Sequence, residues 1–202
     1  MFDRFAERLT AYHDASVADA VWPDHALPTP ESSAIGQAVA DNHRFNGLLW
    51  REEDLARRRL APDSDIAANK RAIDGFNQKR NDAIERIDEA ILGALANVKR
   101  DPAARLNSET AGGMADRLSI LSLKIHNMRL QTLRTDVDAE HIATCRAKLE
   151  KLTEQRTDLA SCLDALLRDA PAGRAYFKIY RQFKMYNDPK LNPQIYRETK
   201  PS

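Results

Sequence analysis

The sequence is poor in the residues that punctuate turns. Only 7 glycines and 9 prolines occur among 202 residues, and most lie between apolar-periodic stretches rather than within them. Sandwiches and barrels rich in turns need more of both residue types, so the composition favours an all-α protein. A hydrophobic fraction of 43% over this length is enough for one sizeable core.

Long apolar runs are also missing. No window approaches the roughly 18 consecutive apolar residues that a membrane-spanning helix needs. The opening MFDRFAERLTAY has neither an uninterrupted apolar region nor a small-residue cleavage site of a signal peptide. We therefore expect a soluble, cytoplasmic protein without a membrane span.

Cysteine is scarce, and the motifs of several known active sites are absent. Cys145 and Cys162 lie 17 residues apart within one predicted helix, so a disulfide between them is implausible and we interpret both as small core residues. No Gly-rich phosphate loop, no Glu-x-x-His pair of a di-iron bundle and no serine or cysteine nucleophile motif occurs.

The chain as a whole has nearly equal numbers of basic and acidic residues. The net charge of +1 argues against general nucleic-acid binding. From Pro171 onward, however, basic residues outnumber acidic ones. The same segment holds the aromatic residues Tyr176, Phe177, Tyr180, Phe183, Tyr186 and Tyr196. We predict a helical bundle over residues 1–170 and a basic-aromatic C-terminal arm over residues 171–202 that docks on the bundle; the alternative is an exposed module for RNA, an acidic membrane or a protein partner.

Apolar residues recur at helical spacing through most of the chain. The predicted helices cover residues 2–20, about 33–60 and about 65–99, a fourth begins near Thr110, and a fifth carries an apolar stripe over 142–166. Ser32 or Ser33 is expected to cap the second helix. The predicted fold class is all-α, a helical bundle of about five long helices with short connections and the C-terminal arm.

The stripe of the fifth helix keeps a near-heptad spacing that only Arg156 interrupts. Such a stripe either packs inside its own bundle or pairs with a second copy of the chain. A homodimer is therefore one of the expected assemblies.

Polar residues interrupt the apolar pattern of the second and third helices. At spacings of three or four they are His43, Asn46, Trp50, Glu53, Asp54 and Arg57, followed by Asn77, Asn81, Glu85 and Asp88. A solvated ion-pair ladder explains the first group as well as a site does. Arg80 lies inside the apolar arc, where an unpaired cation is costly, so we expect it to meet a carboxylate or a ligand anion.

The fourth helix also places cations in its apolar stripe, because Arg117 and Lys124 share a face with Leu121 and Met128. The expected partners are the carboxylates of the second and third helices. Two interpretations stay open: buried ion pairs that fix the helix register, or a polar cavity for an anionic or polyhydroxy ligand.

The segment NSETAGG, residues 107–113, precedes this fourth helix. A helix start with free N–H groups and no obstructing side chains is a natural anion site. The alternative is an ordinary cap by Ser108 or Thr110, with the glycines serving close packing.

Three segments are distinctive in combination: NHRFNGLLWREEDLAR, IDGFNQKRNDAIERID and NSETAGGMADRLSILSLKIHNM. Together they resemble an uncharacterised bacterial family, the domain-of-unknown-function 4254 family, and the closing FKIYRQFKMYNDPKLNPQIY is similar to the end of its proteobacterial members. The family commonly has a proline where this chain has Ala111. The resemblance implies a soluble, mostly helical protein whose genes often lie among those for glycosyltransferases and surface polysaccharides, and it implies no established activity.

The predicted ligand-binding set draws on both the periodicity and the resemblance. It comprises Asn46, Trp50, Glu53, Asn77, Arg80, Asn81, Asp88, Asn107, Ser108, Asp116, Arg117 and Lys124. In the alternative hypothesis, Glu53, Glu85 and Asp88 supply oxygen ligands for magnesium in a hydrolase or transferase acting on a nucleotide or sugar phosphate.

The leading hypothesis is an accessory or ligand-binding protein for surface-glycan assembly. It would bind a sugar phosphate or a sugar nucleotide at the polar core without a metal cofactor, and a glycosyltransferase would be its protein partner. The sequence leaves open whether any reaction is catalysed, and a purely structural helical dimer is a third hypothesis.

Overall fold

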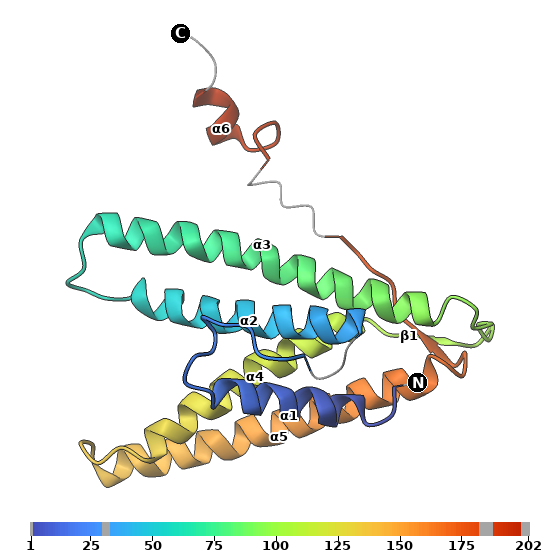
Figure 1. Ribbon diagram of the computed structural model, residues 1–202, viewed down its shortest axis with the longest axis horizontal. Coiled ribbons are helices and arrows are strands. Elements are labelled where there is room, and N and C mark those ends of the chain that lie inside the picture. Colours follow the sequence, from blue (N-terminus) through green and yellow to red (C-terminus); the bar gives the residue numbers. More distant parts are fainter. Residues whose placement is uncertain (1, 30–32, 182–187, 199–202) are drawn as a thin grey trace.

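Five long helices and one short helix make up most of the computed structural model, which describes residues 2–29, 33–181 and 188–198 (Figure 1). The helices are α1 (Phe5–Val17), α2 (Ala34–Leu55), α3 (Asp63–Ala94), α4 (Ala111–Thr132), α5 (Ala139–Asp169) and α6 (Pro193–Glu198). The predicted all-α bundle of about five long helices is confirmed, and α6 adds a short sixth. None of the helices described is long and apolar enough to cross a membrane.

Three of the predicted helices were too long. The first helix spans Phe5–Val17 instead of 2–20, the second ends at Leu55 instead of residue 60, and the third ends at Ala94 instead of residue 99. After α3 the chain continues in tight turns, with the Val98 N–H donating to the Leu95 carbonyl at 2.9 Å. Apolar spacing persists through such turns, so periodicity alone overestimates the length of a helix.

Short polar side chains cap the N-termini of three helices. The Gly36 N–H donates to the Ser33 hydroxyl at 3.0 Å, the Gly113 N–H donates to Thr110 at 3.0 Å, and the His141 N–H donates to Asp138 at 2.7 Å. Each side chain accepts from one of the N–H groups that a helix start leaves unpaired. The predicted cap at Ser33 is confirmed.

Helix α4 is the centre of the bundle, because it contacts α1, α2, α3 and α5. In Figure 1, α2 and α3 form one antiparallel pair, α4 and α5 form another below it, and α1 runs across the front. Ile87 of α3, Leu118 of α4 and Leu163 of α5 are fully buried in one hydrophobic core.

The second half of α5 turns its stripe toward its own bundle, whereas Ile142, Leu149 and Leu152 in the first half are only partly buried. Leu159, Leu163 and Leu166 are buried, and Arg156 interrupts them because its guanidinium reaches Asp14 of α1 at 2.6 Å. Cys145 is buried as expected, whereas Cys162 is exposed, so the core assignment of that cysteine was wrong. Self-association through α5 stays a prediction.

The first residues of the predicted arm pack on the bundle. Strand β2 (Ala175–Tyr176) pairs in parallel with β1 (Arg105–Leu106), and Phe177 is buried in the core. Farther along, Tyr180 is 72% exposed, and α6 stands apart from the bundle in Figure 1. Phe183, Lys184 and Tyr186 lie outside the described residues, and the division at residue 170 stays a prediction.

Glycine at position 112 lets α4 begin against the backbone of α3. A Cβ at Gly112 would lie 2.5 Å from the Ile84 carbonyl oxygen, whereas a Cβ at Gly75 would meet nothing within 4 Å. We therefore expect Gly112→Ala to lower the free energy of unfolding by roughly 1–3 kcal/mol in a urea titration, because the two helices must separate. The matched change Gly75→Ala should raise it by about 0.5–1 kcal/mol, as alanine favours an open helix position. Equal effects of the two substitutions would contradict this close approach.

Candidate functional site

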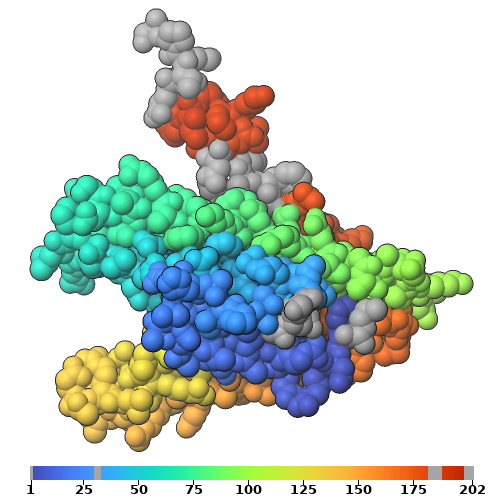
Figure 2. Space-filling model, in the orientation of Figure 1, coloured from blue at the N-terminus to red at the C-terminus, as the bar shows by residue number. Residues whose placement is uncertain are grey.

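Three adjoining cavities form one groove along α4. The largest, about 930 Å³, lies between α2, α4 and α5, and we call it the apolar lobe. The polar lobe, about 680 Å³, lies between α4, α5 and the segment before α4, and the small lobe, about 300 Å³, lies between α2, α3 and α4. In Figure 2 the surface is hollowed between the end of α2 and the yellow tip of the α4–α5 hairpin.

Shared residues join the three lobes. Lys124 and Gln155 line both the apolar and the polar lobe, Trp50 and Asp54 line both the apolar and the small lobe, and Ile120 lines the polar and the small lobe. A ligand in one lobe would therefore adjoin the other two.

The structure divides the predicted ligand-binding set among this groove and the core. In the small lobe lie Asn46, Trp50, Glu53, Asn77 and Arg80, and in the polar lobe lie Asn107, Ser108, Arg117 and Lys124. Asn81, Asp88 and Asp116 line none of the three lobes. Nine of the twelve predicted residues therefore line the groove, and the other three do not.

Arg117 and Lys124 are exposed instead of buried, which corrects the prediction made from their stripe. In the part of the chain that the structure describes, no helix covers the groove side of α4 at these positions, so the apolar periodicity overstated the buried arc. The Arg117 guanidinium lies 2.8 Å from a Glu109 carboxylate oxygen, so its partner comes from the segment before α4 and not from α2 or α3. For the Lys124 ammonium group, no ion pair occurs among the residues described.

Arg80 does meet a carboxylate, as predicted, and this carboxylate belongs to Asp116 of α4. Its Nε lies 3.9 Å from Asp116 Oδ1 and, although buried, makes no hydrogen bond within the described part of the chain. The same Asp116 oxygen accepts hydrogen bonds from the side-chain amides of Asn42 at 2.8 Å and Asn46 at 2.9 Å. Two amides and one distant cation thus hold this buried carboxylate.

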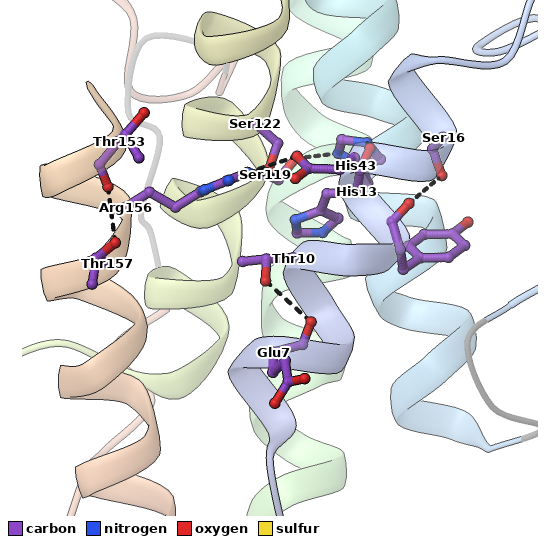
Figure 3. A network of polar contacts seen from close by, with 12 residues as sticks. Glu7, Thr10, His13, Ser16, His43, Ser119, Ser122, Thr153, Arg156 and Thr157 are labelled. Atoms are coloured by element: carbon purple, nitrogen blue, oxygen red, sulfur yellow. Dashed lines mark hydrogen bonds and ion pairs between the residues drawn. The ribbon is translucent and has the colours of Figure 1, made fainter. Parts of the chain in front are cut away.

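The Asn46 amide connects the Asp116 carboxylate to a buried pair of histidines, His43 and His13. It also donates to Ser119 Oγ at 2.9 Å, and His43 Nδ1 lies 2.7 Å from the same hydroxyl. His43 Nε2 lies 3.2 Å from the His13 carbonyl, which can only accept, so Nε2 carries the proton and Nδ1 accepts from Ser119. Figure 3 shows His43, Ser119 and His13 beside one another.

The two histidine rings are stacked with centroids 4.2 Å apart, and the Trp22 ring lies 4.6 Å from His43. Burial lowers the pKa of His43 to about 3 and the pKa of His13 well below its usual range. Both rings are therefore neutral at physiological pH. Since both are fully buried, they join α1 to α2 and cannot contact a ligand in the groove.

Sequence reasoning missed most of this buried network. Asn42, His13, Ser119 and Ser122 are buried, although only their neighbours were singled out. A usable signal existed on α4, where Ser119 and Ser122 occur one turn apart among leucines. Hydroxyls inside an apolar stripe indicate a buried polar partner from another helix.

The start of α4 is occupied by the protein's own groups. The Gly112 N–H donates to the Asp88 carboxylate at 2.6 Å, and the Gly113 N–H donates to Thr110. Burial raises the pKa of Asp88 to about 6, although its hydrogen bonds with Thr110 and Gly112 act in the opposite direction. The predicted anion site at residues 111–113 is therefore wrong, and the alternative of an ordinary cap with glycines for close packing is confirmed.

The acidic residues of the magnesium hypothesis do not converge. Glu53 forms an ion pair with Arg57 at 2.7 Å, and Asp88 caps α4. Within the ranges described, no group of three or more His, Cys, Asp or Glu residues could hold a metal ion. The six charged residues Glu53, Arg80, Glu85, Asp88, Arg117 and Lys124 therefore do not share one pocket, contrary to the expected convergence.

The histidine pair makes stability depend on pH. Its folded pKa values lie below the unfolded value near 6.5, so its contribution is complete above about pH 6.5 and is lost as the pH falls. Asp88 acts in the opposite sense, because its raised pKa stabilises the fold below about pH 6. Two histidines outweigh one carboxyl, so we expect the free energy of unfolding to fall between pH 6.5 and 4.5.

Urea titrations at several pH values measure this dependence. His43→Gln should make the slope shallower by up to about 1.4 kcal/mol per pH unit, the contribution of one proton taken up on unfolding. The exposed His25 provides the matched control, and His25→Gln should leave the slope unchanged. An unchanged slope for His43→Gln would show that this ring does not govern the acid response.

Comparison with known proteins gives one family match. The model of a family described as "Protein of unknown function (DUF4254)" matches residues 36–179, which include the three lobes of the groove. No curated protein and no solved structure matches the chain.

Proposed function

The chain belongs to the DUF4254 family of proteins of unknown function, and we propose that its groove binds a phosphorylated sugar, either a sugar phosphate or a sugar nucleotide. In this proposal the protein is a cytoplasmic ligand-binding or accessory protein in surface-glycan assembly. A glycosyltransferase that receives or supplies the ligand would be its partner.

The observation that carries the proposal is the position of Lys124. Lys124 lines two lobes, and its ammonium group forms no ion pair among the described residues. Lys148 lines the apolar lobe as well and adds a second positive charge to it. Asp54 and Asp158 line the same lobes but do not pair with Lys124. A lysine that forms no ion pair inside a groove is suited to a phosphate, which accepts short, charge-assisted hydrogen bonds.

The polar lobe is suited to the sugar. Asn107, Ser108 and Gln155 offer neutral donors and acceptors there, and Glu109 pairs with Arg117. Lys124 and Asp158 are the other charged residues of this lobe, so its charges sum to zero. A lobe with both kinds of group and balanced charge matches a polyhydroxy ligand better than a second phosphate. The sugar would thus lie beside Arg117, and the phosphate would lie at Lys124.

The magnesium-dependent hydrolase or transferase receives no comparable support, because Glu53, Glu85 and Asp88 do not meet in the groove. Binding without a resident metal is therefore the function that we propose.

Thermal shift assays and calorimetric titration with glucose 1-phosphate, UDP-glucose and inorganic phosphate test the proposal. We expect at least one of the two sugar compounds to raise the melting temperature of the wild-type protein and to bind more tightly than inorganic phosphate. Lys124→Met should weaken that binding roughly ten- to a hundredfold, because a charge-assisted hydrogen bond contributes about 1.5–3 kcal/mol.

Lys99→Met is the matched control, because Lys99 is exposed and lines none of the three lobes. It should leave binding unchanged, and both variants should melt near the wild-type temperature without ligand. If neither sugar compound binds at millimolar concentration, or if both lysine variants lose binding equally, the proposal is wrong.

A further inference from the structure

We infer that the phosphate of the ligand carries an aliphatic chain and that this chain lies in the apolar lobe. The substrate class is then an amphiphilic phosphate, in which an apolar chain is joined through phosphate to a polar group. This inference rests on the proposed function, since it assigns the phosphate to the same lysine.

The two larger lobes differ in the chemistry of their walls. The apolar lobe exposes mainly carbon, because Trp50, Met128, Ala147 and Leu152 line it and the stems of its lysines add methylene groups. The polar lobe exposes polar and apolar atoms in similar proportion. A sugar phosphate confined to the polar lobe would leave the apolar walls in water, which proteins usually avoid for contiguous apolar surface.

Lys124 marks the boundary between these walls. Along α4, Met114, Arg117 and Leu121 line only the polar lobe, whereas Asn127, Met128 and Gln131 line only the apolar lobe. Arg117 and Gln131 each lie seven residues from Lys124, which is about 10 Å along a helix axis. The lysine therefore stands between a polar half and an apolar half of similar length, where the phosphate of an amphiphile lies between its head and its chain.

Charge supports the same order of groups. In the polar half Glu109 compensates Arg117, and in the apolar half the Lys151 ammonium lies 2.6 Å from Glu154. Lys124 and Lys148, in contrast, have no ion pair among the residues described. Asp54 and Asp158, which line the same lobes, do not pair with them, so a purely apolar ligand would leave both lysines without an ion pair. A purely polar ligand would leave the apolar walls uncovered.

Each of the two larger lobes has a size that small molecules occupy. The lobes measure about 930 Å³ and 680 Å³, within the range of small-molecule sites. They also meet at Lys124, so a single flexible molecule can occupy both.

Calorimetric titration of the full chain with butyl, hexyl, octyl and decyl phosphate, each below its critical micelle concentration, tests the inference. Affinity should rise with chain length by up to about fourfold per methylene. Decyl glucoside, which has the chain without the charge, should bind at least tenfold more weakly than decyl phosphate. Lys124→Met should remove that difference.

Ala147→Trp provides the decisive variant, because it fills the apolar lobe from an exposed helix position. It should abolish the gain from chain length while the response to glucose 1-phosphate or UDP-glucose persists. Ala143→Trp is the matched control, one turn earlier on α5, exposed and outside the three lobes. It should leave the chain-length series unchanged.

The outcomes separate this inference from the proposed function. Binding of a sugar compound without any gain from the alkyl chain would overturn the inference and leave the proposed function standing. A chain-length gain that Ala147→Trp does not reduce would also overturn it, since the chain would then bind elsewhere. Alkyl phosphates could also bind in a way that depends on Ala147 and Lys124 while neither sugar compound binds. That result would support an amphiphilic phosphate as the ligand and refute a phosphorylated sugar. Failure of both ligand series would refute both proposals.

Discussion

The hydrogen bond from the Gly112 N–H to the Asp88 carboxylate fixes the rotation of α4, and the arrangement of the other polar residues depends on that rotation. Gly112, Asp116 and Ser119 follow one another at steps of four and three residues and therefore share a face. Because Gly112 is held against α3, Asp116 faces the amides of α2 and Ser119 faces His43. The contact at the start of α4 thus positions the buried hydrogen-bond network of Asp116 and Ser119 along the next two turns.

The same rotation leaves Arg117 and Lys124 in the groove. Arg117 directly follows Asp116, and neighbouring helix positions differ by about 100° around the axis. If α4 were turned by that angle, a guanidinium would replace the carboxylate opposite Asn42 and Asn46, and their amide N–H groups would face a cation. The buried acceptor therefore selects one register and, with it, the side of α4 that stays open.

Local signals in the sequence were sufficient for the fold class, the cap at Ser33 and the expectation that Arg80 meets a carboxylate. They were not sufficient for the environment of α4, whose apolar residues occur on more than one side. Leu118, Leu123 and Ile125 are buried as well as Leu121, so periodicity could not identify the side that a neighbouring helix covers. That choice depends on helix pairs far apart in sequence, such as Asp88 with Gly112.

Asp88 illustrates the limit most clearly. Its spacing from Asn81 and Glu85 is the same whether the stripe lines a pocket or meets another helix, so the sequence alone left both interpretations open. The glycine pair was compatible with an anion site or with an ordinary cap and close packing. Both belong to a single contact, in which the Asp88 carboxylate accepts from the Gly112 N–H group that a ligand anion would otherwise use.

The width of the groove depends on α1, although α1 lines none of its lobes. The groove walls belong to two helix pairs, with Trp50 on α2 and Leu152 on α5. Helix α1 joins both pairs: its His13 carbonyl meets His43 of α2, while its Asp14 meets Arg156 of α5. At its start, the Ala6 N–H also donates to Asp164 of α5 at 3.0 Å. Because these contacts hold α2 and α5 at a fixed separation, the buried histidine network and the open groove are mechanically linked, and a ligand that bridges Trp50 and Leu152 would stabilise the same arrangement from the opposite side.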